Sequence, residues 1–280
     1  MAPSLDYIKC PYCSADSSSI WASENGFNAV KCSFCGFIYV NPRPSQALID
    51  SAVTTGIHTE TTFEKSAFAR RVPAKISFYR RVFSKLYSDL WSSAKPISWI
   101  DIGSGYGEVI EALSSLAPTG SCIEGVEPMQ YKANYAISKG LKVHNTYLSS
   151  ITRKYQFASS VHVFSHIPNF RSFLQDVVSI LESKGEFYLE TGNAADLLSN
   201  KEVPTELDLP DHLTFAGKKH LIGFLEEAGF EIVDIHEVRR DDLLNFLKNI
   251  VKKFLRRKVS LRLPYTSNHR ALQIRARLLK

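Results

Sequence analysis

A glycine-rich turn at the end of a short apolar strand constrains the fold of this chain more than any other feature. Residues 97–102 have the character of a buried strand, and residues 108–116 carry apolar side chains at helical spacing. The strand ends in Asp101-Ile102-Gly103-Ser104-Gly105-Tyr106-Gly107, whose three alternating glycines let the backbone turn sharply and approach a ligand closely. The sequence therefore predicts a ligand-binding turn between a strand and a helix.

Strand-like and helix-like segments alternate through the rest of the chain. Further candidate strands are residues 121–126, 141–145, 157–163, 185–190, 231–238 and 270–277. Candidate helices are residues 128–139, 170–182 and 218–228. Such alternation implies an α/β fold, in which a largely parallel sheet is covered by helices on both faces.

The segment before the glycine turn has three parts. Asn41-Pro42-Arg43-Pro44-Ser45 interrupts any strand, because proline lacks the amide hydrogen and restricts the residue before it. Residues 51–62 lack periodicity and are predicted to form a loop, whereas Pro73 opens a helix that runs to about Trp91. The aromatic residues of this helix either cap a ligand pocket or pack on the sheet, and packing is the commoner role.

Four of the five cysteines form two Cys-x-x-Cys pairs, which favours a metal site in a reducing compartment over disulfides. The gap between the pairs is typical of zinc ribbons, where four thiolates bind one structural zinc ion tetrahedrally. A redox role needs a thioredoxin-like βαβ context, which the flanking sequence lacks. We expect the zinc ligands to be Cys10, Cys13, Cys32 and Cys35.

Spacing separates two kinds of nucleotide-binding domain that use such a glycine turn. A dinucleotide-binding fingerprint requires a third glycine where this chain has Glu108. Glu127 stands at the predicted end of the next strand, where an acid accepts hydrogen bonds from the hydroxyls of a ribose. The dinucleotide interpretation is therefore weakened, and the turn with its acid stays consistent with another ribose-containing ligand.

These residues resemble those of the class I S-adenosylmethionine-dependent methyltransferases. The resemblance rests on residues 101–107 and on Gly125-Val126-Glu127-Pro128, and it continues in residues 161–167 and 211–215. With the cysteine pairs, the chain is similar to zinc-ribbon methyltransferases of sugar, surface-polysaccharide and natural-product pathways. The resemblance implies a Rossmann-like seven-stranded methyltransferase sheet with helices on both faces, plus a small N-terminal zinc ribbon.

The resemblance also implies a site for S-adenosylmethionine and a division into domains. Asp101 would anchor the amino group of the cofactor, and Glu127 its ribose. The methionine and ribose part would be lined by Gly103, Ser104, Gly105 and Gly107. We expect a zinc-binding module at 1–44, a helical linker or cap at 45–95 and the methyltransferase domain at 96–280.

Methyl transfer requires alignment of the acceptor with the methyl group, and a weakly nucleophilic acceptor also needs a general base. In open α/β sheets the reacting groups lie beyond the carboxyl ends of the strands. That criterion selects His166, Glu190, Thr191, Asn193 and Asp211-His212. Of these, His166 and His212 are the candidate bases or substrate-orienting residues, and each has a structural role as its alternative.

The basic charge of the chain is confined to its C-terminal part. The formal net charge is +6, and 13 of the 34 Lys and Arg residues but only two of the 28 Asp and Glu residues lie in 239–280. A basic amphipathic helix near 241–258 either packs its apolar stripe in the core, contacts an anionic membrane or holds a phosphate-bearing substrate. No apolar stretch has the length of a membrane span, so a cytoplasmic protein is the default expectation.

The expected function is methyl transfer to a sugar, polysaccharide precursor or related small metabolite, with a small-molecule or glycan acceptor as partner. RNA methylation is an alternative, although residues 1–50 contain only Lys9, Lys31 and Arg43 as basic residues, too few for a nucleic-acid reader. A zinc-stabilised scaffold with a vestigial cofactor site is a further alternative. The sequence identifies the donor more closely than the acceptor.

Overall fold

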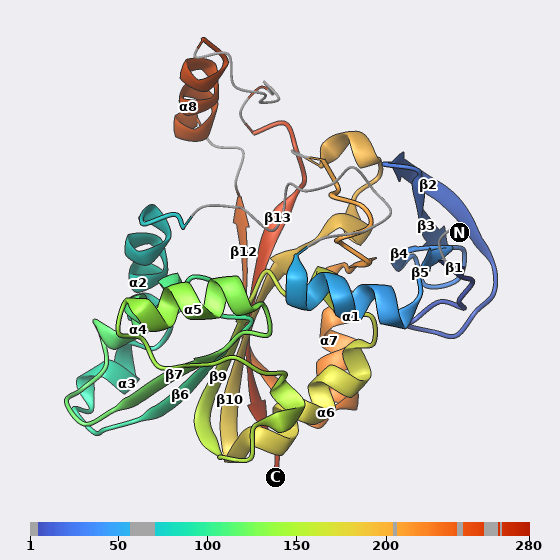
Figure 1. Ribbon diagram of the computed structural model, residues 1–280. Coiled ribbons are helices and arrows are strands. Elements are labelled where there is room, and N and C mark those ends of the chain that lie inside the picture. Colours follow the sequence, from blue (N-terminus) through green and yellow to red (C-terminus); the bar gives the residue numbers. More distant parts are fainter. Residues whose placement is uncertain (1–4, 57–70, 204–205, 240–242, 255–262, 264) are drawn as a thin grey trace.

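The computed structural model describes residues 5–56, 71–203, 206–239, 243–254, 263 and 265–280, and a seven-stranded sheet forms its centre (Figure 1). The strands of this sheet are β6 (Ser98–Ile102), β7 (Cys122–Val126), β8 (Val143–His144), β9 (Tyr155–Val161), β10 (Leu181–Gly192), β12 (Phe230–Arg239) and β13 (Arg270–Leu278). Their order is β12-β13-β10-β9-β6-β7-β8. The pairs from β10 to β8 are parallel, whereas β13 is antiparallel to both β10 and β12. The predicted α/β fold with a largely parallel sheet is confirmed.

Helices cover both faces of this sheet. They are α2 (Ala74–Leu86), α3 (Ser88–Ser92), α4 (Glu108–Ser114), α5 (Gln130–Ser138), α6 (Phe170–Ile180) and α7 (Lys218–Glu227). Short 3₁₀ turns occur at η1 (Leu148–Ser150), η2 (Phe164–His166), η3 (Ala194–Asp196) and η4 (Asn200–Glu202). Most of these elements lie within a few residues of their predicted bounds.

Side-chain alternation along the central strands divides the core into two layers. On β6, Ile100 packs with the apolar residues of α6 and α7, whereas its neighbour Trp99 packs with those of α2 and α4. On β10, Phe187 and Tyr188 divide in the same way. Because successive side chains of a strand point to opposite faces, both faces of the sheet are apolar and both are covered.

The structure corrects two predictions in the segment before the sheet. Residues 51–55, predicted as loop, belong to helix α1 (Gln46–Thr55), and residues 57–62 lie outside the described residues. The threonines made this segment look like a loop in the sequence. In the helix, the hydroxyls of Thr54 and Thr55 donate hydrogen bonds to the carbonyl oxygen of Ser51, at 3.0 and 2.7 Å. The helix predicted from Pro73 to Trp91 is divided into α2 and α3 at Tyr87.

The N-terminal module forms two small sheets. Its strands are β1 (Leu5–Asp6), β2 (Ser18–Glu24), β3 (Phe27–Cys32), β4 (Ile38–Val40) and β5 (Arg43–Pro44). β4 ends before the prolines as predicted, but Arg43–Pro44 still pairs with β1, so that part of the prediction is wrong. A two-residue pairing needs few amide donors, which is why a proline fits there.

The larger of these two sheets also includes a strand from a distant part of the chain. The order of the four-stranded sheet is β11-β4-β3-β2, and β11 (Thr214–Phe215) comes from the segment directly after Asp211-His212. The pairing of Thr214 with Tyr39 therefore places the module against a candidate catalytic segment.

The predicted basic helix is present as α8 (Leu243–Phe254), between β12 and β13. Residues 241–242 and 255–258 of the predicted range lie outside the described residues. Among the described helices, none combines the length and the apolar character that crossing a membrane requires.

Candidate methyl-transfer site

The glycine turn has the backbone geometry that its sequence predicts. Gly103 and Gly105 have φ angles of +68° and +56°, in the left-handed region that side chains disfavour. A Cβ atom added to Gly103 would lie 2.5 Å from Cγ2 of Val163, whereas one added to Gly105 would meet no atom within 4 Å. Gly103 is thus required for packing, and Gly105 presents bare backbone to open space.

The carboxylate of Glu127 supports this turn. One oxygen accepts the backbone N–H of Gly105 at 2.7 Å, and the other accepts that of Met129 at 3.0 Å. The side chain is only 6% exposed, yet it lines the same pocket as the turn. Since a carboxylate has about four acceptor positions, both oxygens keep capacity for further donors such as ribose hydroxyls.

Asp101 is buried at the head of the turn. Its carboxylate accepts a hydrogen bond from Oγ of Ser159 at 2.6 Å, and that hydroxyl accepts one from Nε1 of Trp99 at 3.0 Å. Burial raises the pKa of Asp101 to about 7, opposed by the Ser159 hydrogen bond and reinforced by the carboxylates of Glu127 and Glu108. A cationic ligand group beside Asp101 would relieve this unfavourable charge.

A pocket of about 650 Å³ brings these residues together. Its floor comprises Asp101, residues 103–106 and Glu127, and its walls include Tyr79, Met129, Leu148 and His166. The sequence-predicted cofactor residues Asp101, Gly103, Ser104, Gly105 and Glu127 therefore share one cavity. Gly107 is absent from its lining and instead begins α4 with a φ of +85°.

The two candidate histidines lie in contact, and Asp211 pairs with the first of them. Nδ1 of His166 lies 3.0 Å from the carbonyl oxygen of Asp211 and 3.5 Å from its carboxylate. Nδ1 of His212 lies 2.7 Å from the carbonyl oxygen of Leu207. The two rings meet edge to face at 4.7 Å between centroids.

Their surroundings shift the two pKa values in opposite directions. Burial alone would lower the pKa of His166, but its hydrogen bonds to Asp211 raise that pKa above the usual value. Burial, together with the nearby His166, lowers the pKa of His212 to about 4. At neutral pH, His212 is therefore uncharged, and donation from Nδ1 to Leu207 leaves a lone pair on Nε2.

A second pocket of about 230 Å³ adjoins the first. Its lining combines apolar residues such as Leu207 and Phe215 with polar ones, which include Ser165, Thr191, Glu206, His212, Thr214 and His269. His162 lines both pockets. The smaller pocket is thus placed to receive an acceptor next to the larger one.

His162 and the buried network around Glu190 were not recognised as a unit from sequence. Glu190 is fully buried, and its oxygens accept hydrogen bonds from Tyr188 at 2.7 Å, Gln273 at 2.9 Å and Tyr79 at 3.3 Å. Nε2 of His162 lies 3.4 Å from the same carboxylate. The signal was the position of His162 directly after strand β9, at the carboxyl edge of the sheet.

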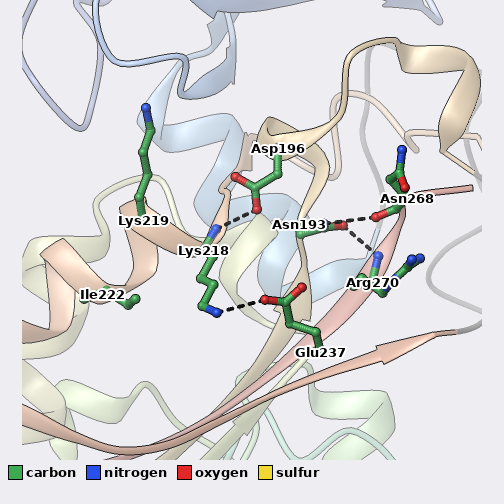
Figure 2. A pocket seen from close by; sticks show the side chains of 8 residues that line it. All are labelled: Asn193, Asp196, Lys218, Lys219, Ile222, Glu237, Asn268 and Arg270. Atoms are coloured by element: carbon green, nitrogen blue, oxygen red, sulfur yellow. Dashed lines mark hydrogen bonds and ion pairs between the residues drawn. The ribbon is translucent and has the colours of Figure 1, made fainter.

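Asn193, also selected from sequence, lies elsewhere. Its side chain accepts the backbone N–H of Arg270 at 2.7 Å and donates to the carbonyl of Asn268 at 3.2 Å, tying the end of β10 to the start of β13. Figure 2 shows it in a separate polar depression beside Lys218, whose ammonium group pairs with Glu237 at 2.9 Å. Asn193 is therefore outside the two adjoining pockets.

The four predicted zinc ligands converge at one point. Sγ of Cys10 lies 3.5 Å from that of Cys35, and Sγ of Cys13 lies 3.6 Å from that of Cys32. All four sulfur atoms lie within 4.8 Å of one another. Tetrahedral thiolates at about 2.3 Å from zinc would be roughly 3.8 Å apart, so the cluster fits one zinc ion.

The thiol pKa values also suit a metal site. Burial raises the pKa of Cys10 to about 11, and it raises that of Cys35. Although burial opposes it, the backbone amides of Cys35 and Phe34 lower the pKa of Cys32 to about 7. One thiolate is thus available near neutral pH, and a cation would assist deprotonation of the others.

The cysteine turns contact the large domain through α6 and α7. Arg171 on α6 donates to the carbonyls of Pro11 and Tyr12, at 2.6 and 2.8 Å. His220 on α7 donates from Nε2 to the carbonyl of Cys35 at 2.9 Å. Both contacts bind the backbone of the Cys-x-x-Cys turns, so packing against α6 and α7 acts on the same loops that carry the four cysteines.

A family model described as a methyltransferase domain matches residues 75–235, which is more than half of the chain and includes the whole glycine turn at 101–107. The chain belongs to this methyltransferase family. The match confirms the family-level resemblance, and it includes the sequence from α2 to most of β12.

One relative of this methyltransferase is the C-methyltransferase NovU of Streptomyces niveus, 24% identical over 145 residues. The match covers 49% of this chain and 33% of that protein, so the chain spans about a third of the relative's length. Two solved structures share the fold. An S-adenosylmethionine-dependent methyltransferase from Archaeoglobus fulgidus is 18% identical with a TM-score of 0.52, covering 72% of this chain and 94% of that one. A putative sarcosine dimethylglycine methyltransferase from Galdieria sulphuraria is 15% identical with a TM-score of 0.54, covering 70% and 85%.

The larger pocket of this methyltransferase fits a cationic, ribose-containing methyl donor. The buried carboxylates of Asp101 and Glu127 line it together, and the bare backbone at Gly105 leaves space beside them. Oγ of Ser104 is buried and has no hydrogen-bond partner among the described residues. Negative charge, unused acceptors and an unpaired hydroxyl match the amino group, sulfonium and hydroxyls of S-adenosylmethionine.

Proposed function

We propose that this methyltransferase transfers the methyl group of S-adenosylmethionine to a sugar, a polysaccharide precursor or a related small metabolite. The observation that carries the proposal is the position of His162, which lines both the pocket of the glycine turn and the smaller pocket beside it. We call these the donor pocket and the acceptor pocket. A small acceptor pocket whose lining includes hydroxyl, imidazole and carboxyl groups suits a polyhydroxylated molecule.

In the donor pocket, Asp101 holds the amino group and Glu127 the ribose hydroxyls. Gly103, Ser104 and Gly105 bring their backbone close to the methionine part. When bound, S-adenosylmethionine supplies an electrophilic methyl group on a sulfonium. The buried carboxylates of Asp101 and Glu127 would favour this cation.

In the acceptor pocket, His212 is the general base in this proposal. Its Nε2 lone pair would accept the proton of the acceptor O–H or C–H, and the bound donor would supply the methyl group and leave as a neutral thioether. His166, whose pKa is raised by Asp211, donates a hydrogen bond and orients the acceptor. Because the two rings are in contact, the proposed base and the proposed orienting group lie side by side where the two pockets adjoin.

We also propose that the cysteine cluster binds a structural zinc ion. Four cysteines leave no open coordination position for a substrate, so the metal stabilises the module rather than the reaction. The relative NovU is a C-methyltransferase, which supports carbon as an acceptor atom to be tested beside oxygen. That relative is matched over a third of its length.

A methyl-transfer assay with labelled donor tests the proposal. Purified protein is incubated with a panel of nucleotide sugars, glycans and RNA, and label is expected in a sugar-containing acceptor. Label in RNA alone would support the RNA alternative, and absence of cofactor binding by calorimetry would support the scaffold. His162→Asn should raise KM for the acceptor while the Kd for the donor stays within about twofold, with His236→Gln on β12 as the matched control.

A further inference from the structure

Helix α8 exposes most of its apolar face. Leu243, Leu247, Val251 and Phe254 follow one another at helical spacing, and their side chains are 51%, 50%, 58% and 85% exposed. Figure 1 shows the helix standing away from the layered body of the molecule. Four large apolar side chains on one side of a twelve-residue helix are unfavourable in water, so this stripe indicates a binding surface.

The two flanks of this stripe are basic. Lys248 and Lys253 are exposed, and helical spacing places one on each side of the apolar stripe. The surrounding sequence, residues 239–280, carries 13 Lys and Arg residues against two Asp residues. A partner must therefore accept apolar side chains and attract cations at the same time.

The helix is joined to the edge of the sheet where the two pockets open. β12 ends at Arg239, which pairs with Arg270 at the start of β13, and Ala271 pairs with Gly192 at the carboxyl end of β10. The acceptor pocket is lined by Ala271 and His269 from the same edge. A surface bound by α8 would thus face the side of the molecule that receives the acceptor.

We propose that α8 binds the surface of an anionic lipid bilayer. The stripe Leu243, Leu247, Val251 and Phe254 enters the boundary between headgroups and acyl chains, and the lysines contact the lipid phosphates. An anionic bilayer matches both the apolar stripe and its basic flanks, whereas an apolar protein groove would leave the basic flanks without a role. This inference stands on α8 itself and does not depend on the proposed acceptor.

Vesicle binding tests the proposal with the full chain. We expect co-sedimentation with vesicles of phosphatidylglycerol and phosphatidylcholine, weak binding to phosphatidylcholine alone, and a loss of roughly tenfold or more in 0.5 M NaCl. The double variant Leu247→Asp/Val251→Asp should weaken binding by roughly tenfold or more, because two charges replace inserted side chains. Leu198→Asp, at a 93% exposed position elsewhere, is the matched control and should bind as the parent does.

Insertion is measured separately with Phe254→Trp. Its fluorescence, taken as the difference from the parent protein, should shift to shorter wavelength on adding anionic vesicles. Calorimetric binding of S-adenosylmethionine by each variant at the parent's affinity is the folding control, whereas absence of binding by the parent would contradict the cofactor proposal and not the membrane proposal. Equal binding to both vesicle types, no binding, or a salt-insensitive dimer that Val251→Asp dissociates would overturn the membrane proposal.

Discussion

The carboxylate of Glu24 accepts the backbone N–H of Leu207 at 2.7 Å, although 183 residues separate them. A second bond, to the N–H of Leu209, measures 3.2 Å. Leu207 in turn accepts the Nδ1 hydrogen of His212. The N-terminal module therefore holds the backbone that orients the proposed base.

Glu24→Gln should lower kcat without changing cofactor binding. An uncharged amide accepts backbone N–H groups more weakly, and the lost charge-assisted bond is worth about 1–2 kcal/mol, or roughly five- to thirtyfold in kcat if all of it reaches the transition state. The measurement is steady-state kinetics together with calorimetric titration of S-adenosylmethionine. Glu226→Gln, at an exposed position on α7, is the control. An unchanged kcat would mean that the loop is positioned without Glu24.

Cys13→Ser should remove bound zinc and impair turnover more than donor binding. The thiolate is one of four ligands, and loss of the module's order would release the segment that carries His212. Metal content by mass spectrometry and activity are measured on the same preparation. Cys122→Ser replaces the cysteine outside the cluster and should retain the parent's metal content. Full zinc content in Cys13→Ser would contradict the assigned ligand set.

Asp101→Asn should stabilise the cofactor-free protein at high pH while weakening donor binding. The native pKa of Asp101 is raised to about 7 by burial, so folding favours its protonated form and stability falls as pH rises from about 4 to 7. At pH 8 the free energy of unfolding of the variant should exceed that of the parent by at most roughly 4 kcal/mol, because the pKa of Asp101 is raised by about three units. Urea denaturation at pH 5 and pH 8 measures the difference, with exposed Asp89→Asn as control. The same pH dependence in variant and parent would show that Asp101 is ionised without cost.

His212→Gln should lower kcat by about 10²–10⁴-fold, the usual contribution of a general base, and leave the donor Kd unchanged. In the parent, activity should fall as pH falls toward 4, because protonation of His212 removes its acceptor lone pair. That acidic limb should be absent from the residual activity of the variant. His236→Gln is the matched control. A variant with full activity would show that another group, or solvent, removes the proton.

Local sequence patterns predicted the residues of the donor pocket because these residues lie in one turn and at the end of the next strand. Gly103 and Gly105 carry the turn, and Glu127 follows one strand later and bonds directly to Gly105. The helix α1 was missed because its threonines satisfy their hydroxyls on their own helix, which periodicity does not register.

The acceptor side depends on contacts between distant segments, which spacing does not reveal. Asp211 stands beside His212 in sequence yet bonds to His166. Glu190 was selected for its position after a strand, but its partners Tyr79 and Gln273 come from the two ends of the domain. Tertiary packing decides which polar groups meet, so the pairing of Asp211 with His166 and the partners of Glu190 could be seen only in the structure.

Titration of S-adenosylmethionine into the parent and Glu127→Gln is the most direct measurement of the central claim, that the glycine turn and its acid form the donor site. The parent should bind the cofactor, and Glu127→Gln should bind it ten- to a hundredfold more weakly, a loss of about 1.4–2.7 kcal/mol. Circular dichroism should show the same fold in both. Undiminished affinity in Glu127→Gln, or no binding by the parent, would contradict the account.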